Sequence, residues 1–83
     1  MKILHIIRDP NNETPLEIAK SQSTEHEVAV LLLHDAVYAI PDVQFQVYAC
    51  TADAQVRGVT RHECVDHKRI VQMLFEFDKV VSW

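Results

Sequence analysis

Short runs of apolar residues alternate along the chain with segments in which apolar residues recur at helical spacing. Residues 28–33 are six consecutive apolar residues, and residues 3–7 are nearly as apolar. Continuous runs of this kind are typical of parallel strands that are covered on both faces. Three shorter segments, residues 45–49, 63–65 and 79–82, also predict strands.

The first connecting segments carry signals for a helix and a short helical turn. Thr14 can cap a helix that has Pro15 at its first position, and a glutamate two residues further can complete a capping box. This helix is expected to extend to about residues 21–23. A short helical turn is expected over residues 36–40, because the proline that follows stops it.

Two further helices are predicted in the second half of the chain. Thr51 can cap a helix that extends to Arg57, and Gly58, the only glycine, follows it where a C-terminal glycine cap belongs. Asp66 can cap a last helix. The apolar residues that we expect on the packing face of this last helix are Ile70, Met73, Leu74, Phe75 and Phe77.

The predicted elements alternate as β-α-β-α-β-α-β-α-β. This order predicts a single α/β domain over residues 1–83, a three-layer α/β/α sandwich with a five-stranded, mainly parallel sheet. Crossovers between parallel strands are right-handed. Sites in such folds form at the carboxyl ends of the strands, which here include residues 7–9, 33–35 and 49–51.

Composition narrows the functions that such a domain can have. The chain has 83 residues, and a domain of this size buries only roughly 60–65% of its unfolded surface, so association would add stability. Its net charge of −4 and its scattered basic residues argue against direct binding to nucleic acid. No apolar segment is long enough to span a membrane or to serve as a signal peptide. We expect a soluble, cytoplasmic protein.

Motifs for cofactors and metals are weak. With one glycine, the chain has no glycine-rich phosphate loop, and we expect no cofactor. His62, Cys64, Asp66 and His67 have the spacing H-x-C-x-D-H, which suggests zinc. Zinc, however, needs about four converging ligands, commonly from two separated pairs. We therefore favour a surface loop that leads into a strand and a helix, and expect no metal.

The chain has two cysteines, Cys50 and Cys64, and no C-x-x-C motif. In a cytoplasmic protein, two such cysteines are expected to be free thiols. Cys50 follows the third predicted strand and precedes a helix, whose unpaired N–H groups favour the thiolate, the reactive form of cysteine. His34 lies at the same predicted edge of the sheet and can act on a thiolate as a base or as a cation.

A second interpretation stays open for these residues. Cys50 can be a small buried hydrophobic residue at the end of a strand, a common place for cysteine. His34 can cap the strand end or lie at a subunit contact. Trp83 can pack on its own domain or on a neighbouring subunit, since tryptophan is enriched at interfaces.

Four segments together resemble the DsrH/TusB branch of the DsrE/DsrF/DsrH superfamily. They are LHIIRDP (residues 4–10), LLLHDAVYA (31–39), VYA (47–49) followed by VRG (56–58), and DKVVSW (78–83). The resemblance covers nearly the whole chain and depends on the order and spacing of these segments and on the final tryptophan. Ala36 stands where the family usually has glycine.

The resemblance implies a subunit that assembles with DsrE/TusD-like and DsrF/TusC-like relatives into a ring-like hetero-oligomer. TusBCD complexes pass persulfide sulfur towards 2-thiolation of the tRNA wobble uridine, and DsrEFH complexes serve sulfur oxidation. In both, the main sulfur carrier is a cysteine of the DsrE/TusD-type subunit, and the DsrH/TusB-type subunit is usually a structural partner. Some DsrH members carry a cysteine in the first helix, but residues 16–20 here contain none.

Cys50 departs from the DsrH/TusB pattern, which normally has an aliphatic residue there. Its placement resembles that of the DsrE/TusD carrier cysteine: a strand, the cysteine, a short alanine-rich helix, then Arg57-Gly58. We predict a sulfur-relay subunit that acts mainly as a structural partner. Two alternatives stay open: an independent persulfide carrier or sulfurtransferase that uses Cys50 with help from His34, and a homo-oligomeric interaction module without sulfur chemistry.

Overall fold

Five parallel strands form one sheet with the spatial order β4-β3-β2-β1-β5. The structure, a computed structural model, describes all of residues 1–83. The strands are β1 (Lys2–Ile7), β2 (Glu27–Leu32), β3 (Gln46–Cys50), β4 (Glu63–Val65) and β5 (Lys79–Ser82). The predicted α/β fold with a five-stranded parallel sheet is therefore confirmed.

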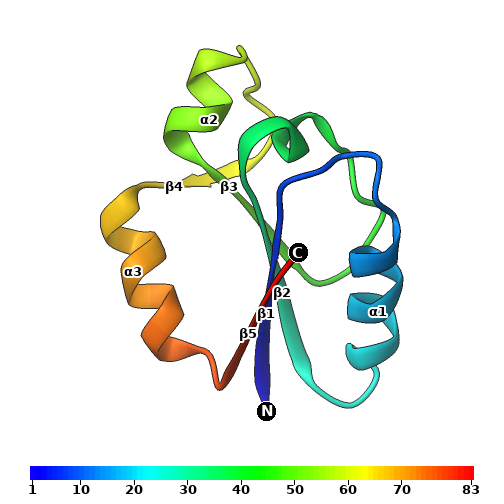
Figure 1. The fold of residues 1–83 in the computed structure, drawn as a ribbon. Coiled ribbons are helices and arrows are strands. Elements are labelled where there is room, and N and C mark those ends of the chain that lie inside the picture. The colour runs from blue at the N-terminus through cyan, green and yellow to red at the C-terminus, as the bar shows by residue number, and fades with distance from the viewer.

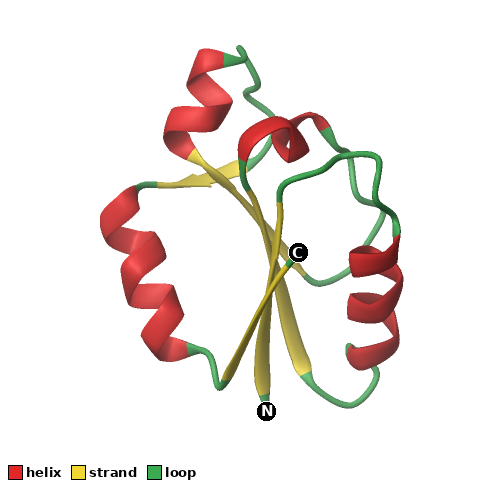
Figure 2. Ribbon diagram, viewed as in Figure 1, coloured by secondary structure: helices red, strands yellow, loops and turns green.

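The helices lie on both faces of this sheet and at its carboxyl edge. They are α1 (Thr14–Gln22), α2 (Thr51–Val56), α3 (His67–Glu76) and the 3-10 turn η1 (His34–Tyr38). Figure 1 shows α1 and α3 on opposite sides of the strands, with α2 and η1 gathered at the end where β2 and β3 finish. Figure 2 shows the alternation of strand and helix along the chain. No helix combines the length and the apolar character that a membrane crossing requires.

The order of the strands explains why both faces are covered. From β1 to β4 each new strand is added on the same side of the last one, whereas β5 returns across the sheet to pair with β1. Because parallel crossovers are right-handed, this reversal of direction puts α3 on the face opposite α1.

Two clusters of buried side chains correspond to the two faces of the sheet. One cluster on the α1 face joins Ile3 and Val30 to Ala19 of α1, and the other joins Leu4 and Leu31 to Met73 of α3. Successive residues of a strand point to opposite faces, so β1 and β2 serve both clusters. All residues of β2 after Glu27 are buried, as expected for a central parallel strand.

The predicted end of α2 is confirmed at Gly58, whose φ of 67° lies in the left-handed region. The N–H of Gly58 donates to the carbonyl of Gln55 at 3.2 Å, and the N–H of Val59 donates to the carbonyl of Ala54 at 2.9 Å. This pair of bonds is a Schellman motif, which favours glycine at the left-handed position. The predicted cap of α3 is also confirmed, because the Asp66 carboxylate accepts the backbone N–H of Arg69 at 2.8 Å.

Two other predicted caps are wrong by one residue. Glu13 is the N-cap of α1 and makes no side-chain cap bond, while Thr14 is already the first helical residue. The side chain of Asn12 accepts the Thr14 N–H at 3.2 Å, so a turn in the preceding loop replaces the expected capping box. Cys50 itself, and not Thr51, is the N-cap of α2.

The packing face of α3 is narrower than predicted. Met73 is fully buried, and Ile70 and Phe77 pack partly buried beside it. Phe75 is instead 86% exposed and Leu74 is 41% exposed. Phe75 lies two residues after Met73, which rotates it roughly 200° around the helix and away from the sheet.

Candidate functional site

Cys50 and His34, the two residues that the sequence singled out, lie at the same edge of the sheet. Cys50 ends β3 and begins α2, and its side chain is buried, with 4% of the residue exposed. His34 follows β2 at the start of η1 and is exposed. Its φ of 53° makes it the one non-glycine residue with a left-handed backbone.

Asp53 connects these two residues. It lies in the first turn of α2, where its carboxylate accepts the backbone N–H of His34 at 2.9 Å. The Cys50 thiol lies close enough to this carboxyl group to contribute to lowering its pKa. Asp53 thus holds the end of β2 against the end of β3.

Arg57, one turn further along α2, completes the network. Its Nη1 lies 3.5 Å from the Asp53 carboxylate and donates to the Asp53 backbone carbonyl at 3.2 Å. Its Nε donates to the carboxylate of Asp35 at 3.0 Å. One arginine therefore bridges an aspartate of α2 and an aspartate of η1, and fixes these two elements relative to each other.

The surroundings of Asp53 lower the pKa of its carboxyl below the ordinary value of 3.8. The largest cause is the backbone N–H of His34, and the Cys50 thiol, the charge of His34 and the charge of Arg57 act in the same direction against partial burial. Asp53 is therefore ionised at neutral pH.

The network shows what each predicted site residue contributes. The bond that ties His34 to the site comes from its backbone N–H, and no hydrogen bond joins its imidazole to the Cys50 thiol. Asp53 and its role between the two residues were not predicted from the sequence. A signal was available, since Asp53 and Arg57 are four residues apart on a helix, the spacing of a supporting ion pair.

The two cysteines are free thiols, as expected. Strand register places Cys50 opposite Val65 and Cys64 opposite Ala49. Neighbouring residues of a strand point to opposite faces, so the two sulfurs diverge and cannot form a disulfide without movement of the backbone.

The residues of the H-x-C-x-D-H segment serve separate structural roles. The ring Nε2 of His62 hydrogen-bonds the carbonyl of Val37 at 2.9 Å, and Asp66 caps α3. Cys64 is exposed on β4. No group of three potential metal ligands converges anywhere in the structure.

The described cavities lie away from the thiol. One, of about 420 Å³, is lined by residues at the amino end of the sheet, among them Lys2, Tyr48 and Phe77. Another, of about 520 Å³, lies along residues 42–45. Neither is lined by Cys50 or His34.

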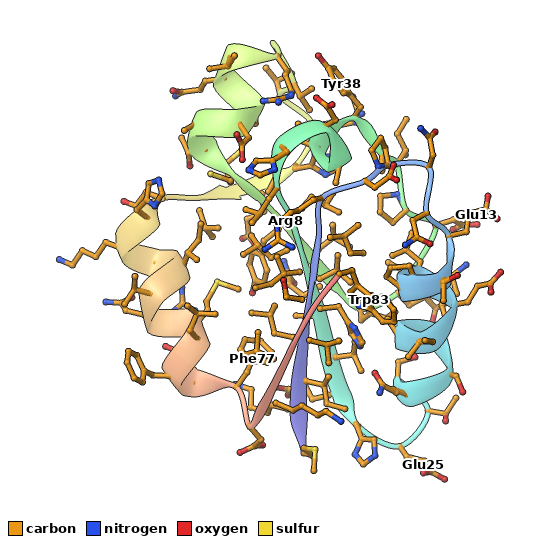
Figure 3. All side chains as sticks on the ribbon, in the orientation of Figure 1. Arg8, Glu13, Glu25, Tyr38, Phe77 and Trp83 are labelled. Carbon is orange, nitrogen blue, oxygen red and sulfur yellow. The ribbon has the colours of Figure 1, made fainter.

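Trp83 contacts its own domain, as one of the two interpretations expected, and 37% of the residue stays exposed. Its indole N–H donates to Nδ1 of His5 at 3.0 Å. Figure 3 shows Trp83 between the end of β5 and α1. Arg8 holds the backbone at this end, since its guanidinium donates to the hydroxyl of Ser82 and to the carbonyl of Trp83.

Comparison with known proteins shows a structural similarity to a solved protein. No family model matches the chain, and no curated protein matches it. A crystal structure of the ychN protein from E. coli superposes with a TM-score of 0.75, over 99% of this chain and 98% of that one, at 17% sequence identity. At this identity the likeness shows that the two chains share one fold over their whole length.

Proposed function

We propose that this protein is a cytoplasmic subunit of a sulfur-relay complex and acts mainly as a structural partner of the subunit that carries sulfur. Two findings support the proposal together. The fold that the chain shares with the ychN protein from E. coli covers 99% of this chain and 98% of that one. The segments that resemble DsrH/TusB subunits contribute β1, β2, β3 and β5 of this fold.

The observation that carries the structural role is the burial of Cys50. A persulfide carrier passes sulfur by attack of a thiolate on a sulfur atom, which requires access to the thiol. Here the residue is 4% exposed, and it lines neither of the two cavities described above. These conditions favour a cysteine that packs over one that transfers sulfur.

Side chains on α3 support association with other subunits. Val71, Leu74 and Phe75 are 52%, 41% and 86% exposed, and their spacing places them on one side of the helix. A small domain gains stability when such apolar surface is covered. The proposed partners are DsrE/TusD-like and DsrF/TusC-like subunits, in a relay that leads to thiolation of tRNA or to sulfur oxidation.

The proposal is tested by intact-mass spectrometry after incubation with a cysteine desulfurase and cysteine. We compare the wild type with Cys50→Ala and with Cys64→Ala, which removes the exposed thiol. We expect no gain of sulfur that depends on Cys50. In a complex reconstituted with the two paralogous subunits, Cys50→Ala is expected to leave assembly and sulfur transfer unchanged.

The carrier role of Cys50 is the second candidate. Its position as the N-cap of α2 favours it, because the amino end of a helix carries partial positive charge, although the Cys50 side chain makes no cap hydrogen bond. A gain of one sulfur mass that Cys50→Ala abolishes and Cys64→Ala retains would establish this role instead. A chain that associates only with itself and leaves relay subunits unbound would establish the homo-oligomeric module.

A further inference from the structure

His5 occupies the centre of the sheet as the only buried residue of polar or charged type. It lies in the middle of β1 with no exposed surface, on the face that α1 covers. A buried imidazole is costly unless both of its nitrogens have partners. Here both nitrogens have a partner: one bonds Gln22 of α1, and the other bonds Trp83, which follows β5.

The partners fix the protonation of the ring. The indole N–H of Trp83 donates to Nδ1 at 3.0 Å, and because an indole is a donor only, Nδ1 must carry a lone pair. Nε2 lies 2.6 Å from the side-chain oxygen of Gln22 and donates its hydrogen there. His5 is therefore neutral with the hydrogen on Nε2. The two rings are also stacked, with centroids 6.1 Å apart and planes inclined by 23°.

The groups around His5 would not stabilise the positive charge of a protonated imidazole. On α1 the residues turned to the sheet, such as Ala19 and Gln22, are uncharged, and Val30 lies opposite on β2. On β5 the residue on the same face as Val81 is Lys79, a cation. The residue that carries the indole is in turn held by a cation, since the Arg8 guanidinium donates to the carbonyl of Trp83 at 2.7 Å. The carboxylates of the elements packed against His5, Glu17 of α1 and Glu27 of β2, belong to exposed residues. The two ring nitrogens bond Gln22 and Trp83 instead, and neither of these side chains is charged.

We propose that His5 is an acid-sensitive latch that holds the indole of Trp83 in the neutral form and releases it on protonation. A proton taken from solvent by Nδ1 occupies the lone pair that accepts the indole hydrogen. Two N–H groups then face each other, the hydrogen bond breaks, and the indole leaves the ring. The inference does not depend on the proposed sulfur-relay function.

The sign of the pH dependence follows from the two states. The docked state binds no proton at Nδ1, whereas a released imidazole can be protonated, and histidine changes charge between about pH 5 and 8. Acid therefore favours release. Once the released form is protonated, the ratio of docked to released indole falls about tenfold for each pH unit.

Trp83 is the only tryptophan, so fluorescence reports on the latch directly. We would measure the emission maximum and quenching by acrylamide from about pH 8 to about pH 5, the range over which histidine titrates. We expect a shift to longer wavelength and stronger quenching on acidification, while circular dichroism shows that the fold persists. An emission maximum and quenching that stay constant with pH would overturn the latch, as would acid unfolding of the whole domain in the same step.

Two variants make the test specific. His5→Gln keeps an acceptor for the indole and a donor for Gln22 but cannot be protonated, so it should keep the indole docked across the range. His26→Gln removes an exposed histidine of the α1–β2 connection and should leave the response unchanged. A response that persists in His5→Gln, or disappears in His26→Gln, contradicts the proposal.

A second measurement keeps the proposal falsifiable if His5→Gln does not fold. Nitrogen-15 chemical shifts of the wild-type imidazoles distinguish the two tautomers near neutral pH. We expect His5 to carry its hydrogen on Nε2. A hydrogen on Nδ1 would overturn the latch, because the indole then has no acceptor.

Discussion

The carboxylate of Asp53 accepts the backbone N–H of His34 at 2.9 Å, and His34 has the left-handed φ of 53°. The side chain of Asp53 thus fixes a turn that a non-glycine residue rarely adopts. Because the bond uses the backbone N–H, the imidazole of His34 is not needed for it.

Glycine at position 34 should be better tolerated than alanine. A left-handed conformation costs a residue with a Cβ roughly 1–2 kcal/mol, and glycine avoids this cost. We expect His34→Gly to be more stable than His34→Ala by about 1 kcal/mol, after the larger backbone entropy of unfolded glycine is included. Urea unfolding followed by circular dichroism measures the difference. Equal stabilities would show that the turn does not depend on its left-handed residue.

Asp53→Asn should destabilise the fold in a pH-dependent way. The variant removes the charge that faces Arg57 and the His34 N–H, and hydrogen bonds to charged groups contribute about 1.5–3 kcal/mol, less where solvent reaches them. The folded pKa of Asp53 is lowered, so its contribution is fully present above the ordinary value of 3.8 and is lost as pH falls through the lowered folded pKa.

We expect the difference in unfolding free energy between wild type and Asp53→Asn to be constant near neutral pH and to shrink below about pH 4. Denaturant unfolding at a series of pH values measures it. Asp42→Asn, at an exposed loop position, is the control and should change stability little. A difference that grows as pH falls would contradict the assigned role of Asp53.

Gly58→Ala should cost stability through the backbone alone. A Cβ at this position would meet no atom within 4 Å, so there is no steric clash, but φ is 67°. We expect a loss of about 1–2 kcal/mol from the left-handed conformation. The measurement is thermal or urea unfolding. A neutral result would mean that the C-terminal turn of α2 moves readily to another conformation.

The two sides of α3 should respond differently to truncation. Met73→Ala removes a fully buried side chain and should cost about 2–5 kcal/mol. Phe75→Ser changes an exposed side chain and should change the stability of the monomer by less than about 0.5 kcal/mol. If the exposed apolar side of α3 binds another subunit, Phe75→Ser reduces the molar mass of the assembly in light scattering. An unchanged mass would place the subunit contact elsewhere.

Local signals in the sequence predicted most of the fold. The last two strands have the predicted bounds, and Gly58 and Asp66 end and begin their helices as expected. A glycine at the end of a helix and an aspartate at its start interact with residues that are adjacent in the chain, so the local sequence is enough to predict where these helices end and begin. Phe75 was misplaced because apolar character alone does not say on which side of α3 the sheet lies.

The candidate site was only partly predictable for a similar reason. Parallel topology brings the ends of β2 and β3 together, so the common edge of Cys50 and His34 followed from the order of elements. The bond from Asp53 to His34 spans 19 residues and depends on the orientation of α2 over that edge. The burial of Cys50 likewise depends on the packing of α2 over this edge, which the residues next to Cys50 in the sequence do not determine.

The position of β5 has a consequence for how the chain folds. Residues 79–82 of β5 follow the other four strands in the chain, yet they pair with residues 3–6 of β1. During synthesis, β1 therefore keeps one row of backbone N–H and C=O groups unpaired until β5 emerges. Contacts of such long sequence separation slow folding, and an open strand edge invites pairing with other chains. Completion of the sheet is thus the late step in which this small domain is most exposed to aggregation.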